Sequence, residues 1–150
     1  MRREGSSAVY ERDYILRLIT QVGHALRAMV HAIREQRPDD ALETARDAIL
    51  ALTDADPVLV DAMTGEGLVT FLSAGGRIDV LRCRMLAEVL VERAEAYQSA
   101  GQDARAAAER ERARVLLEAA AREADGEDAE SIAALVERID AGEGGGGSER

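Results

Sequence analysis

The sequence contains no lysine, asparagine or tryptophan, and it has a single cysteine, Cys83. One cysteine excludes a disulfide framework within the chain and a zinc site built from several cysteines. Without lysine, the phosphate-binding loop motif cannot be formed. Aromatic residues make up 3% of the chain, so the apolar side chains are mainly Ala, Leu, Val and Ile. This mixture favours closely packed helices.

Positive charge is scarce and unevenly placed. The 150 residues carry 19 Arg against 29 Asp and Glu, which gives a formal net charge of −10. Residues 1–37 hold seven Arg and four acids, net +3, whereas residues 38–150 hold twelve Arg and twenty-five acids, net −13. Affinity for nucleic acid comes mainly from neutralising phosphates, so we expect no nucleic-acid partner for this acidic chain.

Long hydrophobic runs are also missing. Arg2 and Arg3 resemble the start of a signal peptide, but charged residues at 11–13 and 17 interrupt the apolar stretch that would have to follow. No run of about 18 apolar residues occurs, so we expect neither a signal peptide nor a membrane-spanning helix. Together with the unpaired cysteine, this pattern predicts a cytoplasmic protein.

The first part of the chain has helical periodicity. Apolar residues recur at spacings of three and four at positions 15, 18, 19, 22, 26, 29, 30 and 33. This stripe predicts a helix over 10–36 with one core-facing side. Pro38 ends that helix and opens a second one, which stops before Asp56 and Pro57. The two helices are therefore expected to form an antiparallel hairpin.

The middle of the chain is less regular and then strongly helical. Residues 56–76 predict two short helices, the first capped by Asp56 and the second ending before Gly75 and Gly76. A long helix over 77–100 carries apolar residues on more than one face, which indicates a central position. Gly101 is expected to end it.

An Ala-rich helix is predicted over 103–124, with Arg105 and Glu109 as one of several surface pairs at four-residue spacing. A last helix carries an apolar stripe that includes Ile132 and Ile139 and closes the domain or seals a dimer. We expect a single all-α domain over 10–141, a flexible N-terminus at 1–9 and a disordered Gly-rich tail at 142–150.

Small residues recur in a repeat-like order in the second long hairpin. Ala94, Tyr97, Gly101, Ala106 and Ala113 stand at successive separations of three, four, five and seven, an order that resembles the tetratricopeptide repeat. In the first hairpin, only two positions, 41 and 48, carry the matching alanines. The resemblance implies antiparallel helical hairpins packed as a tetratricopeptide-like bundle.

A second resemblance covers about ten residues. Glu11, Asp13, Tyr14, Ile15, Arg17 and Ile19 match the Glu-x-Asp-Tyr-Ile-x-Arg-x-Ile pattern that opens a family of small bacterial proteins of unknown function. The helices that follow, to about residue 121, also resemble this family, but less specifically. It implies a helical bacterial protein and carries over no activity.

One flank of the first helix gathers positive and polar side chains opposite the core stripe. Its members are Arg17, His24, Arg27, His31 and Arg34, hereafter the basic strip. The strip is a candidate docking surface for an acidic protein partner or for the chain's own acidic helices. The alternative is a solvated face, which most charged helix faces are.

No catalytic or metal-binding constellation is readable from the spacing. His24 and His31 lie seven residues and about 10 Å apart along a helix, too far to hold one metal ion. Neighbouring arginines at 82 and 84 could activate Cys83, but its alignment with apolar residues on the same helix favours a buried side chain. The glycine pattern at 142–147 follows a helix rather than a strand, so the dinucleotide-binding motif fails on context.

These observations favour a non-enzymatic helical module that binds a protein partner or a second copy of itself, with no cofactor and no metal. The alternative is a small-ligand-binding protein or enzyme with a pocket near residues 56–84. That pocket would use three hydroxyls beside three arginines: Thr64, Thr70, Ser73, Arg77, Arg82 and Arg84.

Overall fold

The computed structural model describes the backbone of residues 2–148 and the side chains of residues 10–142. Seven helices and one small strand pair make up the described chain. In chain order they are α1 (Arg2–Arg34), α2 (Pro38–Thr53), α3 (Pro57–Asp61), α4 (Gly65–Phe71), β1 (Ser73–Ala74), β2 (Arg77–Ile78), α5 (Val80–Ser99), α6 (Asp103–Ala121) and α7 (Gly126–Ser148). The all-α prediction is therefore confirmed.

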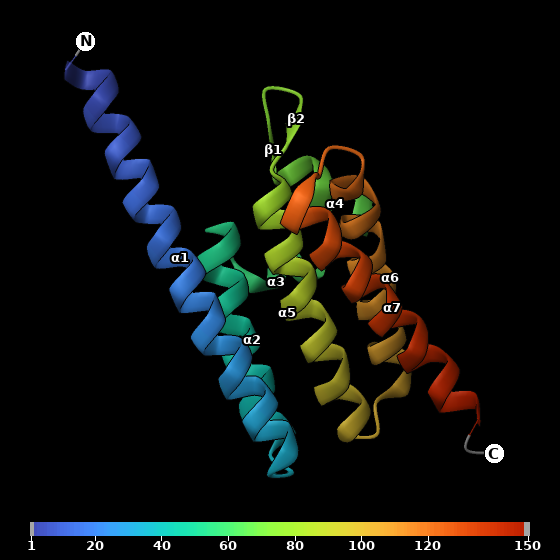
Figure 1. Cartoon of the computed structure of the whole chain (residues 1–150). Helices are drawn as coiled ribbons and strands as arrows, with labels where there is room; N and C mark the ends of the chain where they lie inside the picture. The colour runs from blue at the N-terminus through green and yellow to red at the C-terminus, as the bar shows by residue number, and fades with distance from the viewer. Residues whose placement is uncertain (1, 149–150) are drawn as a thin grey trace.

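Two antiparallel hairpins form the body of the fold (Figure 1). Helices α1 and α2 pair as the first hairpin, α5 and α6 pair as the second, and α2 packs against α5 between them. Helix α4 covers the opposite side of α6, while α7 lies across α5 and α6. Helix α5 is thus central, as its apolar residues on several faces predict.

Local signals set most of the helix ends. Pro38 stands in the first turn of α2, where its missing N–H leaves no bond unmade. Asp56 caps α3 by accepting a hydrogen bond from the Val58 N–H at 2.9 Å. Gly101 takes a φ of +79° just after α5, a conformation that suits glycine. These three predictions are confirmed.

The segment before α5 differs from the expectation. Residues 73–78 form an antiparallel strand pair, with Ser73 opposite Ile78, instead of leading directly into a helix. Gly75 and Gly76 adopt φ values of +60° and +79°, which permits a tight two-residue turn. Helix α5 then begins at Val80, because the Asp79 side chain accepts from the Arg82 N–H at 3.0 Å.

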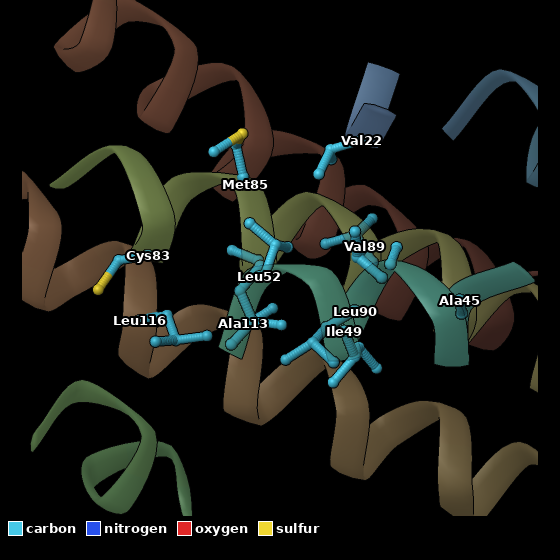
Figure 2. Packing of buried hydrophobic residues seen from close by; sticks show 14 of the residues in the cluster. Val22, Ala45, Ile49, Leu52, Cys83, Met85, Val89, Leu90, Ala113 and Leu116 are labelled. Carbon is cyan, nitrogen blue, oxygen red and sulfur yellow. The ribbon is translucent and has the colours of Figure 1, made fainter. Parts of the chain in front are cut away.

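The core lies where α2, α5 and α6 meet and extends to α1 (Figure 2). Figure 2 shows Ile49 of α2, Leu90 of α5 and Leu116 of α6 in this cluster. Alanines at the crossing of the second hairpin are fully buried, including Ala94, Ala106 and Ala113, as the spacing predicts. Their small side chains let α5 and α6 approach closely. Tetratricopeptide-like packing of the whole bundle stays a prediction.

The two ends of the chain join long helices. The backbone of α1 is helical from Arg2, and that of α7 is helical to Ser148. Residues 1 and 149–150 lie outside the described chain. Flexibility of the segments 1–9 and 142–150 stays a prediction. Ile132 and Ile139 of α7 are buried, so its predicted apolar stripe closes the domain.

Candidate functional site

The five residues of the basic strip all lie exposed on α1, on the side away from the core. Arg27 Nη2 lies 3.1 Å from His24 Nδ1, at hydrogen-bond distance. Among the described residues, Arg17 and Arg34 take part in no ion pair. The structure therefore leaves the strip open to solvent or to a partner, and its role in docking stays a prediction.

Large apolar side chains are exposed at the N-terminal part of the same helix, a stretch hereafter called the α1 tip (residues 10–19). Tyr10, Tyr14, Ile15, Leu16 and Ile19 have exposed fractions of 72, 47, 38, 54 and 42%. Single exposed apolar residues are normal, but five in ten positions, distributed around one helix segment, mark an interaction surface, hereafter the apolar patch.

The exposure of this patch follows from a mismatch in helix length. Helix α1 has 33 residues and α2 has 16, so their lengths are about 50 and 24 Å at 1.5 Å per residue. Figure 1 shows the N-terminal part of α1 running on beyond the end of α2. The sequence predicts Ile15 and Ile19 in the core stripe, and this was wrong. Leu18, next to Ile19, is buried at 4%, so the bundle reaches this turn and Ile19 is exposed because it faces away from the bundle.

A groove joins the α1 tip to α2. It has a volume of about 410 Å³ and lies between α1 and the C-terminal turns of α2. Its apolar residues include Tyr14, Leu18 and Leu50, and its charged residues are Arg17 and Asp54. Leu50 is itself 46% exposed. The groove therefore extends the patch and brings one residue of the basic strip, Arg17, next to it.

Charged side chains are buried on the other side of the molecule, between α3, α5 and α6. The ion cluster consists of Asp61, Arg93, Glu109 and Arg112. Arg93 donates to both carboxylate oxygens of Asp61, at 2.8 and 3.1 Å, and Arg112 donates to Glu109 at 3.0 Å. Arg112 also donates to the carbonyl oxygen of Val60 at 2.7 Å. The cluster thus ties three helices together.

Sequence reasoning missed this cluster. It placed Glu109 on the surface beside Arg105, but Glu109 is 7% exposed and its partners are Arg112 and, at 3.7 Å, Arg93. Arg105 instead lies over the ring of Tyr97, 5.7 Å from its centroid. A usable signal was present, because Arg93 falls inside the helix that was expected to be central. A charge on a helix buried on all sides needs a partner.

The pKa values in the cluster diverge. Burial acts to raise the pKa of Asp61, but the hydrogen bonds and charge of Arg93 outweigh it and lower that pKa. Burial raises the pKa of Glu109 despite the nearby Arg93 and Arg112. Three buried atoms of the cluster lack a hydrogen-bond partner: Arg93 Nε, Glu109 Oε2 and Arg112 Nε. The three buried members of the cluster hold helices together, whereas the side chain of Asp61 is 45% accessible.

An open groove of about 530 Å³ borders the ion cluster between α2, α3 and α5. Leu42 and Val58 supply its apolar lining. Asp61 and Arg93 are shared with the cluster, and the remaining lining residues are Asp39, Glu43, Arg46 and Asp47. Four carboxylates against two guanidinium groups make the groove negative, which suits a cationic ligand.

The hydroxyl pocket expected at residues 56–84 is not assembled as predicted. The hydroxyls of Thr70 and Ser73 donate to backbone carbonyls of α4, and Thr64 caps α4 by accepting from the Gly67 N–H. Arg82 pairs with Asp79. Arg84 pairs with Glu88 and Asp128 on α7, and Arg77 is exposed. The three hydroxyls are therefore used locally.

Cys83 is fully buried on α5, as its alignment with apolar residues predicts (Figure 2). Burial, with a smaller effect of the charge on Asp79, raises the pKa of its thiol to about 11. A thiol with that pKa is almost entirely protonated at neutral pH, so it is a poor nucleophile.

Among the described residues, no group of three or more His, Cys, Asp or Glu side chains fits a metal ion. Within the same part of the chain, no helix has the length and apolar character needed to cross a membrane.

The fold and these surfaces define the chain as an all-α protein of packed helical hairpins with an exposed apolar patch on its first helix. No protein-family model, curated protein or solved structure matches it. The resemblances of residues 11–19 and of the second hairpin stay predictions.

Proposed function

We propose that the protein is a non-enzymatic helical interaction module that docks through the α1 tip. The observation that carries the proposal is the exposure of five large apolar side chains on one helix end, at fractions of 38–72%. Two of the five, Tyr10 and Tyr14, are tyrosines, a residue type enriched among the anchors of protein interfaces. The module works in the cytoplasm.

The basic strip supports the apolar patch in this proposal. Arg17 lies within the patch, and Arg27 and Arg34 continue along the exposed side of the same helix. Apolar anchors at the centre supply most of the binding free energy, whereas charges at the rim mainly set orientation and association rate. The helix therefore combines an anchor and a steering surface on one rigid element.

Site-specific photo-cross-linking tests the proposal. A photoreactive amino acid replaces Leu16 in the full chain, and in a matched control it replaces Leu59 of α3, which is equally exposed at 53% against 54%. We expect protein adducts from position 16, loss of these adducts when Ile19→Arg is added, and none from position 59. Absence of adducts at position 16 in the cells that make the protein would overturn the proposal.

The negative groove beside the ion cluster supports a second candidate, a ligand-binding protein. Its lining includes Val58 and Asp61, which belong to the 56–84 segment. Its four carboxylates favour a cationic small molecule. Spermidine is a suitable probe, and we expect it to raise the melting temperature of the wild type but not of the Glu43→Gln/Asp47→Asn variant. An equal rise in the melting temperature of the wild type and of the variant would mean that spermidine only screens the negative charge of the protein and does not bind in the groove.

A further inference from the structure

We infer that the occupant of the α1 tip is a second copy of this chain, and that the two tips pair antiparallel. The inference rests on the proposed function, since it names the partner of the same surface. Three observations carry it: the accessible area of the chain, the order of charges along the tip, and the position of the tip relative to the acidic bundle.

The accessible area is larger than a compact monomer needs. The chain exposes 9208 Å², whereas a compact monomer of 16.1 kDa exposes about 7,400 Å². The excess of about 1,800 Å² belongs to the whole elongated chain, and it leaves room for the roughly 800 Å² per partner that a stable interface buries. The α1 tip is the part of this surface where large apolar side chains are concentrated.

The charges along the tip are complementary to themselves only in one direction. Glu11 and Asp13 precede Tyr14, and Arg17 follows it. When two copies run antiparallel with Tyr14 opposite Tyr14, position 11 of one copy lies opposite position 17 of the other. Each dimer then gains two Glu11–Arg17 contacts, whereas parallel pairing places like charges side by side.

The position of the tip relative to the acidic bundle also favours antiparallel pairing. The tip runs beyond α2 and away from the rest of the molecule (Figure 1). Residues 38–150 carry a net charge of −13, but residues 10–19 carry two acids and two arginines and are neutral. Antiparallel tips hold the two acidic bundles at opposite ends, whereas parallel tips bring them together, where their charges repel.

A symmetric contact of this kind is isologous and closes at two copies. Tyr10, Tyr14 and Ile15 of each copy lie opposite the stretch 13–18 of the other in this register. Tyr10, Tyr14 and Arg17 share one side of the helix, so the two tyrosines of each copy are then buried in the contact and Arg17 flanks them.

Sedimentation equilibrium of the full chain tests the inference at concentrations between about 1 and 200 μM, which span micromolar dissociation constants. The wild type is expected to reach the mass of two chains at the upper end. Tyr14→Arg is expected to raise the dissociation constant at least about tenfold, since each dimer loses two anchors and gains two facing charges. The control Leu59→Arg on α3, where the native side chain is 53% exposed against 47% for Tyr14, is expected to leave it unchanged.

Charge reversal tests the direction of pairing. We expect Arg17→Glu to raise the dissociation constant about threefold, because both cross-copy contacts become acidic pairs. Glu11→Arg/Asp13→Arg is expected to do the same, and a mixture of the two variants is expected to form a heterodimer at least as tight as the wild type. If neither variant weakens pairing, or if the mixture stays monomeric, the antiparallel arrangement is wrong. Circular dichroism checks that both variants keep wild-type helicity.

The outcomes separate this inference from the proposed function. A wild type that sediments as a monomer at all concentrations overturns the dimer. If cross-linking from position 16 then yields adducts with a different protein, the docking surface stands with another partner. If it yields no adduct at all, the docking surface fails as well.

Discussion

The α1 tip and the ion cluster reverse the usual distribution of residue types. At the tip, Tyr10 and Leu16 stand in solvent at 72 and 54% exposure, while in the cluster Arg93 and Glu109 are buried at 9 and 7%. The buried charges are explained within the chain, because each has an opposite partner within 4 Å. Of the exposed apolar side chains at the tip, Tyr14 has Arg82 over its ring, 5.5 Å from the centroid, but the exposure of Tyr10 and Leu16 has no such explanation within the described chain. The ion cluster therefore stabilises the fold from within, whereas the α1 tip is the surface where a contact with another molecule is expected.

The largest expected effect breaks the ion cluster. Arg93→Ala removes the partner of Asp61 and leaves Glu109 with one arginine in a buried site. We expect it to lower the free energy of unfolding by about 1.5–3 kcal/mol, the range for losing hydrogen bonds to a charged group, since Glu109 keeps Arg112 as a partner. Urea denaturation measures it.

Arg105→Ala is the matched control for this change. Like Arg93, Arg105 lies over the ring of Tyr97, but it is exposed and holds no ion pair among the described residues. We expect a loss within about 1 kcal/mol. Equal losses in the two variants would mean that contact with Tyr97, and not the buried ion pair, stabilises this region.

A smaller effect depends on pH. The pKa of Asp61 is lower in the folded chain than its ordinary value of 3.8, because Arg93 outweighs burial. A lowered pKa stabilises the fold above the unfolded pKa, and this stabilisation is lost as the pH falls through the folded pKa. We therefore expect Asp61→Asn to destabilise by about 1 kcal/mol at pH 7 and much less near pH 2.

Denaturation of both proteins across this pH range measures the effect. Asp61 is half exposed, with 45% of its side chain accessible, so solvent screening limits the gain. A difference between wild type and Asp61→Asn that stays constant from neutral to acid pH would show that the carboxylate charge contributes nothing.

Part of the fold was predictable because its signals are local. Pro38, Asp56 and Gly101 act on the backbone beside them, so the sequence places these helix ends correctly. The alanine spacing of the second hairpin likewise predicts its close helix contact. The strand pair at 73–78 was missed, because two-residue strands carry too little pattern to compete with a helix signal.

The candidate surface was predictable only in part, because it depends on how the helices pack together. The sequence identified α1 as the helix to examine, from its positive charge in an acidic chain. It placed Ile15 and Ile19 in the core, since an apolar stripe does not reveal how far along the helix and how far around it the other helices cover its side chains. Comparing the predicted lengths of the first two helices would have located the uncovered turns.

The smallest expected effect on folding concerns the basic strip. The five side chains are exposed, and Arg17 and Arg34 form no ion pair among the described residues. We expect Arg17→Ala/Arg27→Ala/Arg34→Ala to change the free energy of unfolding by less than about 0.5 kcal/mol. In the same variant, photo-cross-linking from position 16 is expected to lose its dependence on salt concentration.

The outcome for this variant sharpens the comparison between the two regions. If its unfolding free energy falls by as much as that of Arg93→Ala, the strip fastens the fold and is not a steering surface. If the cross-linking yield of this variant depends on salt concentration as strongly as that of the wild type, the basic strip takes no part in docking.

The most direct test of the central claim is hydrogen–deuterium exchange along the full chain at low and high protein concentration. If a second copy covers the α1 tip, amides of residues 10–19 exchange more slowly as concentration rises, while those of α3 keep the same rate. Exchange in the tip that does not change between the two concentrations would contradict pairing between copies.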